Sequence, residues 1–534
     1  MVVRTEVVRG HILPDWLEED GWRTADPMRR IRAMVVLRPA DPQAVARRDA
    51  AGGPSLGVDE TNRLTAPDPI VVVRLADYLA QQGLHVDPPG ADGLYLPFSG
   101  PLEAVTRAFR CTFAARQVDG RLVYLNREEP QVPLWAAAHV LAVVGLENRS
   151  ALRPTHRYPS RGALPANNGR GFFPGDLKAC YNWPSTLTGA GEAIGLLEFS
   201  NGYSVQDVDA FWRQHGIEPL RVAWVSVDGT ANDNGVNAID MECTLDVEWA
   251  GAMAPGAELV VYEAAAGADD VAFSLSMLRA LERVGQDTLH HPGSLSISYG
   301  DAESRFPAAV LQAWDQAAMR LGLRGITVLA ASGDMGAYGI RGEGRPIPHA
   351  DAPASLSHVT GVGGTTLILN PDHTRRQETG WTDTNNNGAS GGGVSVVFPR
   401  PVWQAAAGVP LGPLGEAGRG VPDVALVADP DTGVAVVFQG EPAVIGGTSA
   451  STPMWAALVA LANEARVVMG RPRLGPVNPR VYALGGGLSF HDIVQGNNSI
   501  DGVEGYSCRP GWDAVTGWGS VHAAHLIQAL TDMP

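Results

Sequence analysis

The order of apolar segments along the chain predicts an α/β fold in two parts, a small α+β unit followed by a larger domain built on a parallel sheet. Beyond residue 190, short apolar runs alternate with helical patterns, which is typical of a parallel sheet covered by helices on both faces. A stretch rich in Pro, Gly, Arg and Asn at 151–175 separates the two parts. Charge divides them too, because residues 1–160 carry 19 basic and 19 acidic side chains and the net charge of −17 therefore lies beyond them.

The N-terminal unit contains both strand and helix patterns. Strands are predicted at 32–37 and 93–98, and a hairpin at 113–117 and 122–125 around Asp119-Gly120, a strong turn signal. Helices are predicted at 42–48, 70–82 and 102–109, and residues 136–146 are apolar again. The segment 151–175 that follows has no apolar period and is predicted to be an exposed linker, where proteases commonly cut.

The larger part alternates the two kinds of element. Its predicted strands are 193–199, 221–227, 258–262, 294–299 and 326–331, and its predicted helices are 205–215, 240–252, 270–284, 308–321 and 448–468. Residues 380–445 are rich in Gly, Asn and Pro and are predicted to be dominated by loops. Because sites in such folds form where parallel strands end, the chemistry is expected there.

Composition excludes several classes of protein. The chain of 534 residues has no run of 18 apolar residues for a spanning helix, and Met1–Gly21 shows no apolar core of a secretory signal. Its one lysine, Lys178, leaves almost no candidate for a phosphate-binding lysine or a Schiff base. The acidic charge argues against a nucleic-acid partner. Four cysteines without a CxxC pair are expected to be isolated core residues.

The sharpest chemical motif is Gly446-Gly447-Thr448-Ser449, at the start of the helix predicted for 448–468. Two glycines permit a tight turn, and the serine then stands where free backbone N–H groups can face a developing oxyanion. A nucleophilic serine requires such a turn and such N–H donors. The same residues also suit an ordinary Ser or Thr helix cap, and the motif alone leaves both interpretations open.

A nucleophilic serine needs a base, and no histidine in this sequence follows a strand in the expected motif. Glu242 and Asp246 offer carboxylates instead. They are four residues apart on a predicted helix, so they lie on one face and can share a proton. A solvated acidic face that includes Glu248 is the competing interpretation.

Asp334 stands at the carboxyl end of the strand predicted for 326–331. Polar residues at such strand ends are either turn residues or site residues. The sequence around Asp334 alone does not separate the two.

Together these elements resemble the sedolisin family of serine-carboxyl peptidases, and most closely its kumamolisin-like members. The resemblance extends over nearly the whole chain, and its motifs keep their order and spacing: Glu242-Cys-Thr-Leu-Asp246, Ser296-Ile-Ser298-Tyr299-Gly300, ASGDMG around Asp334, Gly391-Gly-Gly-Val-Ser395 and GGTSASTP around Ser449. It implies a subtilisin-like α/β/α catalytic domain preceded by a ferredoxin-like antiparallel prodomain.

The resemblance also implies roles for these residues. Ser449 would be the nucleophile and Glu242 its general base. Asp246 would orient Glu242 and share its proton, while Asp334 would occupy the oxyanion-hole position. Glu198 would extend the carboxylate network, with Tyr299 standing where a Trp is expected.

One structural calcium ion near the C-terminus is a further implication of the resemblance. The side chains of Asp492 and Asp513 and the carbonyls of Ile493, Arg509 and Gly511 would bind it. Carboxylate and carbonyl oxygens are the ligands that this hard cation prefers. Two aspartate-containing turns without metal are the alternative.

We therefore expect an acid-acting serine-carboxyl endopeptidase made as a self-processing precursor. Residues 1–160 would be the propeptide and intramolecular inhibitor, with a linker to about 175, and residues 161–534 the catalytic domain. Its partners would be protein or peptide substrates, with no nucleic acid and no membrane, and it would be secreted. A tripeptidyl exopeptidase of the same family and an inactive peptide-binding homologue are the alternatives.

Overall fold

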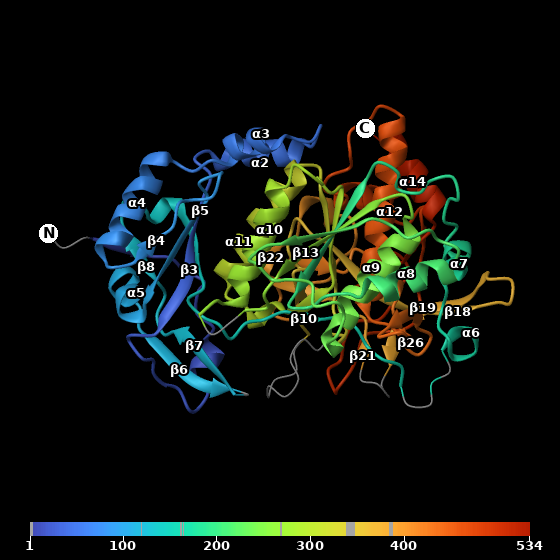
Figure 1. Cartoon of the computed structure of the whole chain (residues 1–534), viewed down its shortest axis with the longest axis horizontal. Helices are drawn as coiled ribbons and strands as arrows, with labels where there is room; N and C mark the ends of the chain where they lie inside the picture. The colour runs from blue at the N-terminus through green and yellow to red at the C-terminus, as the bar shows by residue number, and fades with distance from the viewer. Residues whose placement is uncertain are drawn as a thin grey trace. The chain divides into compact units, whose positions relative to one another are not determined.

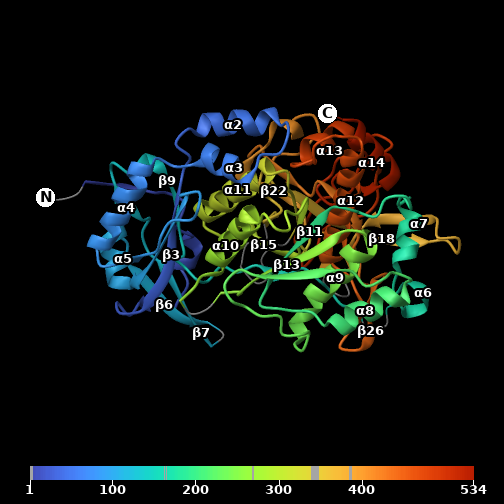
Figure 2. The same cartoon turned by 45° about the horizontal axis from the view of Figure 1, so that its top comes forward.

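The computed structural model describes residues 4–118, 120–160, 163, 165–267, 270–337, 348–383 and 388–533. Asp119, predicted to form a hairpin turn, lies outside the described residues, as do Arg161, Gly162 and Leu164 of the linker. Contacts divide the chain into two compact units. The first comprises Met1–Leu152, Ala265–Gln286 and Ser304–Arg324, and the second Arg153–Ala264, Asp287–Glu303 and Gly325–Pro534. Figures 1 and 2 show the chain from two directions.

A four-stranded antiparallel sheet organises the N-terminal part of the first unit. Its strand order is β4 (His85–Val86), β5 (Tyr95–Pro101), β3 (Arg30–Leu37) and β9 (Val140–Val144). The central strand β3 pairs antiparallel with β5 and β9, and its residues 33–37 are all buried. The helices are α1 (Pro14–Leu17), α2 (Pro42–Ala51), α3 (Val58–Thr65), α4 (Pro69–Gln81) and α5 (Leu102–Phe109). The predicted antiparallel α+β prodomain is thus confirmed.

Smaller strand pairs complete this part. The predicted hairpin is formed by β6 (Phe113–Val118) and β7 (Arg121–Asn126), with β2 (Arg23–Thr24) beside β6, and β1 (Thr5–Val7) pairs with β8 (Gln131–Pro133). Helix α4 begins at Pro69 after an Asp68 cap and buries one apolar face, consistent with its predicted period.

Two later helices belong to the same unit, α10 (Phe273–Gln286) and α11 (Ala308–Leu323). Arg320 of α11 forms an ion pair with the buried Asp92, with 2.5 Å between Nη1 and Oδ2. The Leu37 carbonyl accepts a hydrogen bond of 3.0 Å from the side chain of Gln316. The N-terminal residues of this unit are therefore held to α11 by polar contacts as well as by apolar packing.

The second unit is built on a ten-stranded, mostly parallel sheet. Its order is β12 (Val222–Ser226), β13 (Glu258–Ala264), β11 (Ala193–Phe199), β14 (Ser294–Ile297), β16 (Thr327–Ala331), β18 (Thr360–Leu369), β24 (Val424–Val427), β28 (Ser520–Val521) and β27 (Phe490–His491), with β19 (Arg375–Gly380) paired to β18. The pairs from β12 to β28 are parallel. All seven residues of β11 are buried, as expected for a central strand of such a sheet.

Helices α9 (Met241–Met253) and α12 (Thr448–Val468) pack against each other and against this sheet. Every residue of α9 is buried, which places it in the interior rather than at the surface. The remaining helices of the unit are α6 (Ala166–Gly169), α7 (Pro174–Cys180), α8 (Val205–Gln214), α13 (Asn478–Leu484) and α14 (Ala523–Asp532). In Figure 1 the green α9 and the orange-red α12 lie near one another, in agreement with their contact.

Short strands surround the end of the sheet. They are β10 (Arg153–Pro154), β15 (Tyr299–Ala302), β17 (Asp351–Ala352), β20 (Thr382–Asp383), β21 (Gly388–Ala389), β22 (Gly393–Pro399), β23 (Gly418–Val421), β25 (Val434–Phe438) and β26 (Glu441–Ile445). The strand predicted at 294–299 divides into β14 and β15, which belong to different sheets.

The prediction that loops dominate 380–445 is wrong, because this range supplies β24 to the main sheet and two antiparallel pairs, β22–β23 and β25–β26. Strand β18 also escaped prediction. Its glycines weaken the apolar pattern by which a strand is predicted. They are needed because a Cβ at Gly363 would lie 2.7 Å from Pro422, and a Cβ at Gly364 would lie 2.6 Å from Ala428.

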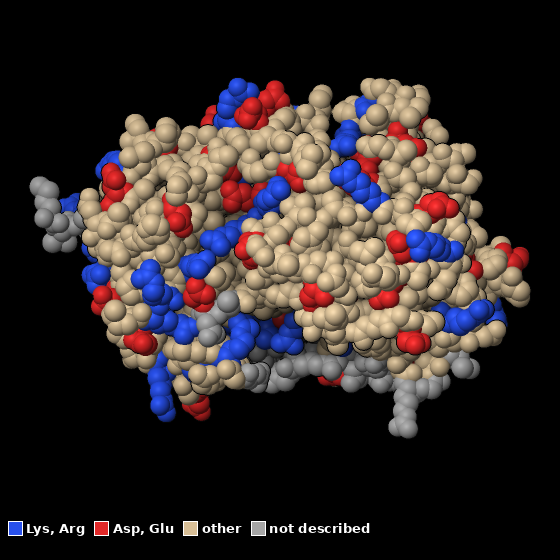
Figure 3. Space-filling model, viewed as in Figure 1, with Lys and Arg blue, Asp and Glu red and all other residues tan. Residues whose placement is uncertain are grey.

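The predicted subtilisin-like α/β fold is confirmed, together with the strands and helices that carry it. No helix among the described residues is long and apolar enough to cross a membrane. All four cysteines are buried and unpaired, as expected. The face seen in Figure 3 presents both acidic and basic side chains among mostly uncharged residues.

A buried ion pair in the second unit provides a test of this packing. Arg419 and Asp423 are fully buried, with 2.7 Å between Nη2 and Oδ2. Arg419→Met should lower the free energy of unfolding by about 3–5 kcal/mol, because Asp423 would stay buried without its cation. Denaturant unfolding measures this. The control, Arg213→Met, removes an exposed pair with Asp209 and should cost less than about 1 kcal/mol. Equal effects would contradict the assignment.

Candidate active site

Ser449 lies in the first turn of α12 and is fully buried. Its hydroxyl lies 2.9 Å from Thr155 Oγ1 and donates toward the Ser298 carbonyl at 3.3 Å. Gly447 caps the helix through its backbone, with φ of 111° and no side-chain cap, so Ser449 is not an N-cap. A Cβ at Gly447 would lie 2.6 Å from Asp334 Oδ2, which explains why the motif needs glycine there.

Glu242 and Asp246 lie one turn apart on α9, and both are fully buried. The solvated acidic face considered for this helix is therefore wrong, and Glu248 is also buried, where it accepts from the Val437 N–H. Both oxygens of Asp246 accept from Ser298 Oγ, at 2.9 and 2.7 Å. Burial, together with the nearby Glu198 and Glu242, raises the pKa of Asp246 well above its usual range.

Asp334 follows β16 and lies close to the start of α12. Its Oδ1 accepts from the backbone N–H of Thr448 at 2.8 Å and from the Thr448 hydroxyl at 2.9 Å. Its Oδ2 is buried and accepts no hydrogen bond from the described residues. Burial raises the pKa of Asp334 to about 6, although Arg157 and the Thr448 donors oppose the shift. The carboxyl therefore keeps its proton in mild acid.

The carboxylate network extends to Glu198 at the end of β11. Glu198 Oε2 accepts from Asn201 Nδ2 and from Tyr299 Oη, both at 3.0 Å. Burial raises the pKa of Glu198 to about 8, with Glu242 adding to the shift. Glu263 pairs in register with Glu198 on β13, and burial raises the pKa of Glu263 to about 9. Sequence reasoning found Glu198 but missed Asn201 and Glu263.

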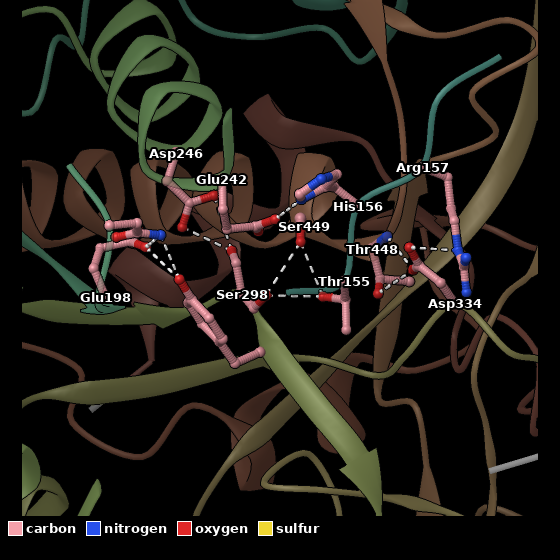
Figure 4. A network of polar contacts seen from close by, with 12 residues as sticks. Thr155, His156, Arg157, Glu198, Glu242, Asp246, Ser298, Asp334, Thr448 and Ser449 are labelled. Carbon is pink, nitrogen blue, oxygen red and sulfur yellow. Dashed lines mark hydrogen bonds and ion pairs between the residues drawn. The ribbon is translucent and has the colours of Figure 1, made fainter. Parts of the chain in front are cut away.

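The start of the linker lies across these residues (Figure 4). β10 pairs antiparallel with β15, and Arg157 forms an antiparallel bridge with Gly446. Between them, the Thr155 carbonyl accepts a hydrogen bond of 3.0 Å from the backbone N–H of Ser449. The chain is therefore bound as an extended peptide with one carbonyl beside the candidate nucleophile.

Two charged side chains of the linker also reach the site, and sequence reasoning missed both. His156 Nδ1 bonds to Glu242 Oε2, and Arg157 Nε lies 3.8 Å from Asp334 Oδ2. Composition indicated only an exposed linker, so no sequence signal placed these residues here. The linker thus places a basic side chain beside Glu242 and another beside Asp334, two of the four predicted catalytic residues.

The predicted metal ligands come together in part. Asp492 Oδ2 accepts from the Gly511 N–H at 2.9 Å, and Asp513 Oδ2 accepts from the Arg509 N–H at 3.1 Å. The two carboxylates thus meet one loop, 509–513, which offers carbonyl oxygens as well. The described residues hold no cluster of three or more His, Cys, Asp or Glu suited to a metal. Two carboxylates with carbonyls remain a donor set that suits calcium.

Comparisons with known proteins identify the family of this chain. Residues 42–149 match the family model described as Pro-kumamolisin, activation domain. The chain is 38% identical to Kumamolisin of Bacillus sp. (strain MN-32), over 81% of this chain and 78% of that protein. It is 32% identical to Tripeptidyl-peptidase 1 of Rattus norvegicus, over 75% of this chain and 72% of the other.

A solved structure gives the same result. Pseudomonas sedolisin, a serine-carboxyl proteinase complexed with two molecules of pseudo-iodotyrostatin, matches with a TM-score of 0.60 and 28% identity, over 67% of this chain and 97% of the other. Similarity over most of both chains, an activation domain and the shared fold lead to one conclusion: the chain belongs to the kumamolisin and sedolisin family of serine-carboxyl peptidases.

Proposed function

We propose that this peptidase is an acid-acting endopeptidase, made as a precursor that cuts itself, with Ser449 as its nucleophile. One observation carries the proposal: the Thr155 carbonyl accepts a hydrogen bond from the Ser449 N–H, and the Ser449 hydroxyl lies 2.9 Å from the hydroxyl of the same threonine. This peptide bond therefore lies beside the residue that would attack it. The bond between Thr155 and His156 is then the processing site. We also propose, from the family resemblance, that the protein is secreted.

In the proposed mechanism, Ser449 Oγ attacks the carbonyl carbon and Glu242 accepts its proton. The acyl-enzyme forms as Glu242 returns the proton to the leaving amine, and water then releases the acyl group by the same steps in reverse. Asp246 holds a proton next to Glu242, since two buried carboxyls this close cannot both be ionised. Ser298 fixes the orientation of Asp246 through its hydroxyl.

Asp334 and the Ser449 N–H are the proposed oxyanion donors. A carboxyl can donate a hydrogen bond to an oxyanion only when it is protonated. Since the pKa of Asp334 is raised to about 6, the donor is present in acid and is lost as pH rises through that value. This gives the proposed acid optimum a physical cause.

The bound linker favours an endopeptidase over a tripeptidyl exopeptidase. Arg153 would be the third residue before the cut bond, and the chain continues on its N-terminal side rather than ending there. An enzyme that releases only tripeptides needs a free amino terminus at that point. The inactive homologue is disfavoured because all four catalytic candidates, Ser449, Glu242, Asp246 and Asp334, are present and buried together.

Self-processing is the direct test. On acidification, mass spectrometry should show cleavage between Thr155 and His156, within the predicted range of about 155–175. Ser449→Ala should stay full length, because it removes the nucleophile. Ser451→Ala is the matched control and should be processed, since among the described residues the Ser451 hydroxyl bonds only to the carbonyls of Gly363 and Thr448. Processing of pure Ser449→Ala would exclude Ser449 as nucleophile.

The pH dependence tests the carboxyl roles. Peptide cleavage should follow a bell-shaped profile in acid, with its alkaline side set by ionisation of Asp334. Asp334→Asn supplies a donor that does not titrate, so its remaining activity should persist closer to neutral pH. Glu242→Gln cannot accept a proton and should lose several orders of magnitude in turnover. Near-normal turnover in Glu242→Gln would show that another group is the base.

We further propose one structural calcium ion, held by the side chains of Asp492 and Asp513 and by the carbonyls of Ile493, Arg509 and Gly511. The contacts of both carboxylates with loop 509–513 support this, because the cation would neutralise the two carboxylates and tie residues 492–493 to that loop. The ion would stabilise the fold and take no part in the chemistry.

Removal of calcium should therefore lower the thermal unfolding midpoint by several degrees. Asp492→Asn should have the same effect and should reduce the calcium content measured by atomic spectrometry. Asp372→Asn, at an exposed turn, is the control and should match the wild type. A protein that contains no calcium and does not respond to chelator would contradict the site.

A further inference from the structure

Three consecutive linker residues each engage a different group that the reaction needs. The Thr155 carbonyl accepts a hydrogen bond from the Ser449 N–H. The His156 side chain bonds to Glu242, and the Arg157 side chain lies beside Asp334. Figure 4 shows the three residues close to Ser449, Glu242 and Asp334. This segment is therefore bound like a substrate, but its two charged side chains sit on the catalytic carboxyls themselves.

His156 bonds to a carboxylate oxygen of Glu242, the proposed base. Its Nδ1 bonds to Glu242 Oε2, while Glu242 Oε1 is buried without a hydrogen bond from the described residues. The Ser449 hydroxyl has its neighbours elsewhere, in Thr155 Oγ1 and the Ser298 carbonyl. Among the described residues no hydrogen bond joins Ser449 to Glu242. The nucleophile and its base are thus kept apart by the side chains of Thr155 and His156.

Arg157 acts on the oxyanion donor. Its Nε lies 3.8 Å from Asp334 Oδ2, the buried oxygen that accepts no hydrogen bond from the described residues. A guanidinium at this distance favours the ionised carboxylate, which cannot donate. The bound linker therefore stabilises Asp334 in its inactive form.

We propose that His156 and Arg157 are inhibitory residues on the leaving-group side of the cut bond, and that the same two positions of any substrate select against basic side chains. This inference rests on the proposed self-processing at Thr155–His156. It assigns an acidic residue to each of the two substrate positions after the cut bond: Glu242 lines the first position and Asp334 lines the second. Once the bond is cut, the new N-terminal segment can carry both cations away.

Several charged or titratable groups face these two carboxyls. Those around Glu242 are His156, Tyr158, Glu198, Asp246, Tyr299 and Asp334, and those around Asp334 are Arg157, His156 and Glu242, with Asp351 against the adjacent Gly333. Burial alone lowers the pKa of His156, but Glu242 and Asp334 outweigh it and raise the pKa overall. The imidazole is therefore held as a cation on Glu242.

The direction of the pH effect follows from Arg157. With Arg157 bound, the pKa of Asp334 reaches only about 6, because the guanidinium opposes the effect of burial. Without that cation the pKa is higher, so the protonated donor survives to higher pH. Cutting of the linker should thus need more acid than cutting of a peptide that has neutral residues at the same two positions.

The experiment uses the full-length precursor and follows its conversion by gel densitometry from strongly acid to neutral pH. Arg157→Gln should move the alkaline limit of processing upward by about one pH unit, the effect of one cation about 4 Å away in a water-like dielectric. His156→Gln should speed processing at its optimum by roughly tenfold, as a charge-assisted bond is replaced by a neutral one. Arg170→Gln removes an exposed linker cation that contacts no catalytic group, and should match the wild type.

The outcomes separate this inference from the proposed function. No processing by the wild type would reject the proposed function itself. Processing by the wild type with an unchanged pH limit in Arg157→Gln would overturn the role of Arg157. Loss of all processing in His156→Gln would overturn the role of His156, since its imidazole would then be required rather than inhibitory.

A second measurement does not depend on the folding of the variants. The processed enzyme is given two peptides that differ only after the cut bond, one with His-Arg and one with Gln-Gln. The His-Arg peptide should be cut more slowly and only to a lower pH limit. Equal rates and equal pH limits for the two peptides would overturn the inference.

Discussion

The burial of carboxyl groups with few cations to balance them is the constraint on which this site depends. Glu198, Glu242, Asp246, Glu263 and Asp334 are all buried near the ends of β11, β13, β16 and the start of α9. A buried carboxylate without a cation is costly, so most of these groups must keep their protons. Burial accordingly raises the pKa of four of these groups, Glu198, Glu263, Asp246 and Asp334. An acid-acting mechanism is the natural use of such a group.

The fold supplies this burial in a specific way. Helix α9 is buried on every side, so its two carboxyls cannot turn to solvent. Strand β11 carries Glu198 one residue before its end, in register with Glu263 of the parallel strand β13, and the glycines before α12 let that helix begin against Asp334. Each carboxyl is therefore held by a helix or strand whose apolar side chains belong to the core. The packing of the core thus also fixes the position of the carboxyls.

The catalytic candidates could be predicted from sequence because they sit in compact motifs; each motif alone left a structural interpretation open, and the resemblance to the family decided between them. The Gly-Gly-Thr-Ser turn, the four-residue spacing of Glu242 and Asp246, and the strand-end position of Asp334 each depend on local geometry. The strand β18 could not be predicted, since its glycines weaken the pattern while permitting close contacts. The linker could not either. Residues 154–157 have the composition of an exposed loop, and only tertiary contacts reveal that they are bound.

Tyr299 shows how the network accommodates a departure from the family pattern. An indole N–H can only donate, whereas a phenol both donates and accepts. Tyr299 Oη accepts from Asn201 Nδ2 at 2.5 Å and donates to Glu198 Oε2 at 3.0 Å. Even with these donors, burial keeps the pKa of Glu198 at about 8, so Glu198 is neutral throughout the acid range.

A neutral Glu198 has a consequence for Glu242, the proposed base. With Glu198 and Asp246 both protonated in acid, neither of them places a negative charge beside Glu242. A general base must be ionised, and one charge is tolerated here where two or three would repel one another. The protonated carboxyls around Glu242 thus spare the proposed base their repulsion, and His156 of the linker is the cation that contacts it.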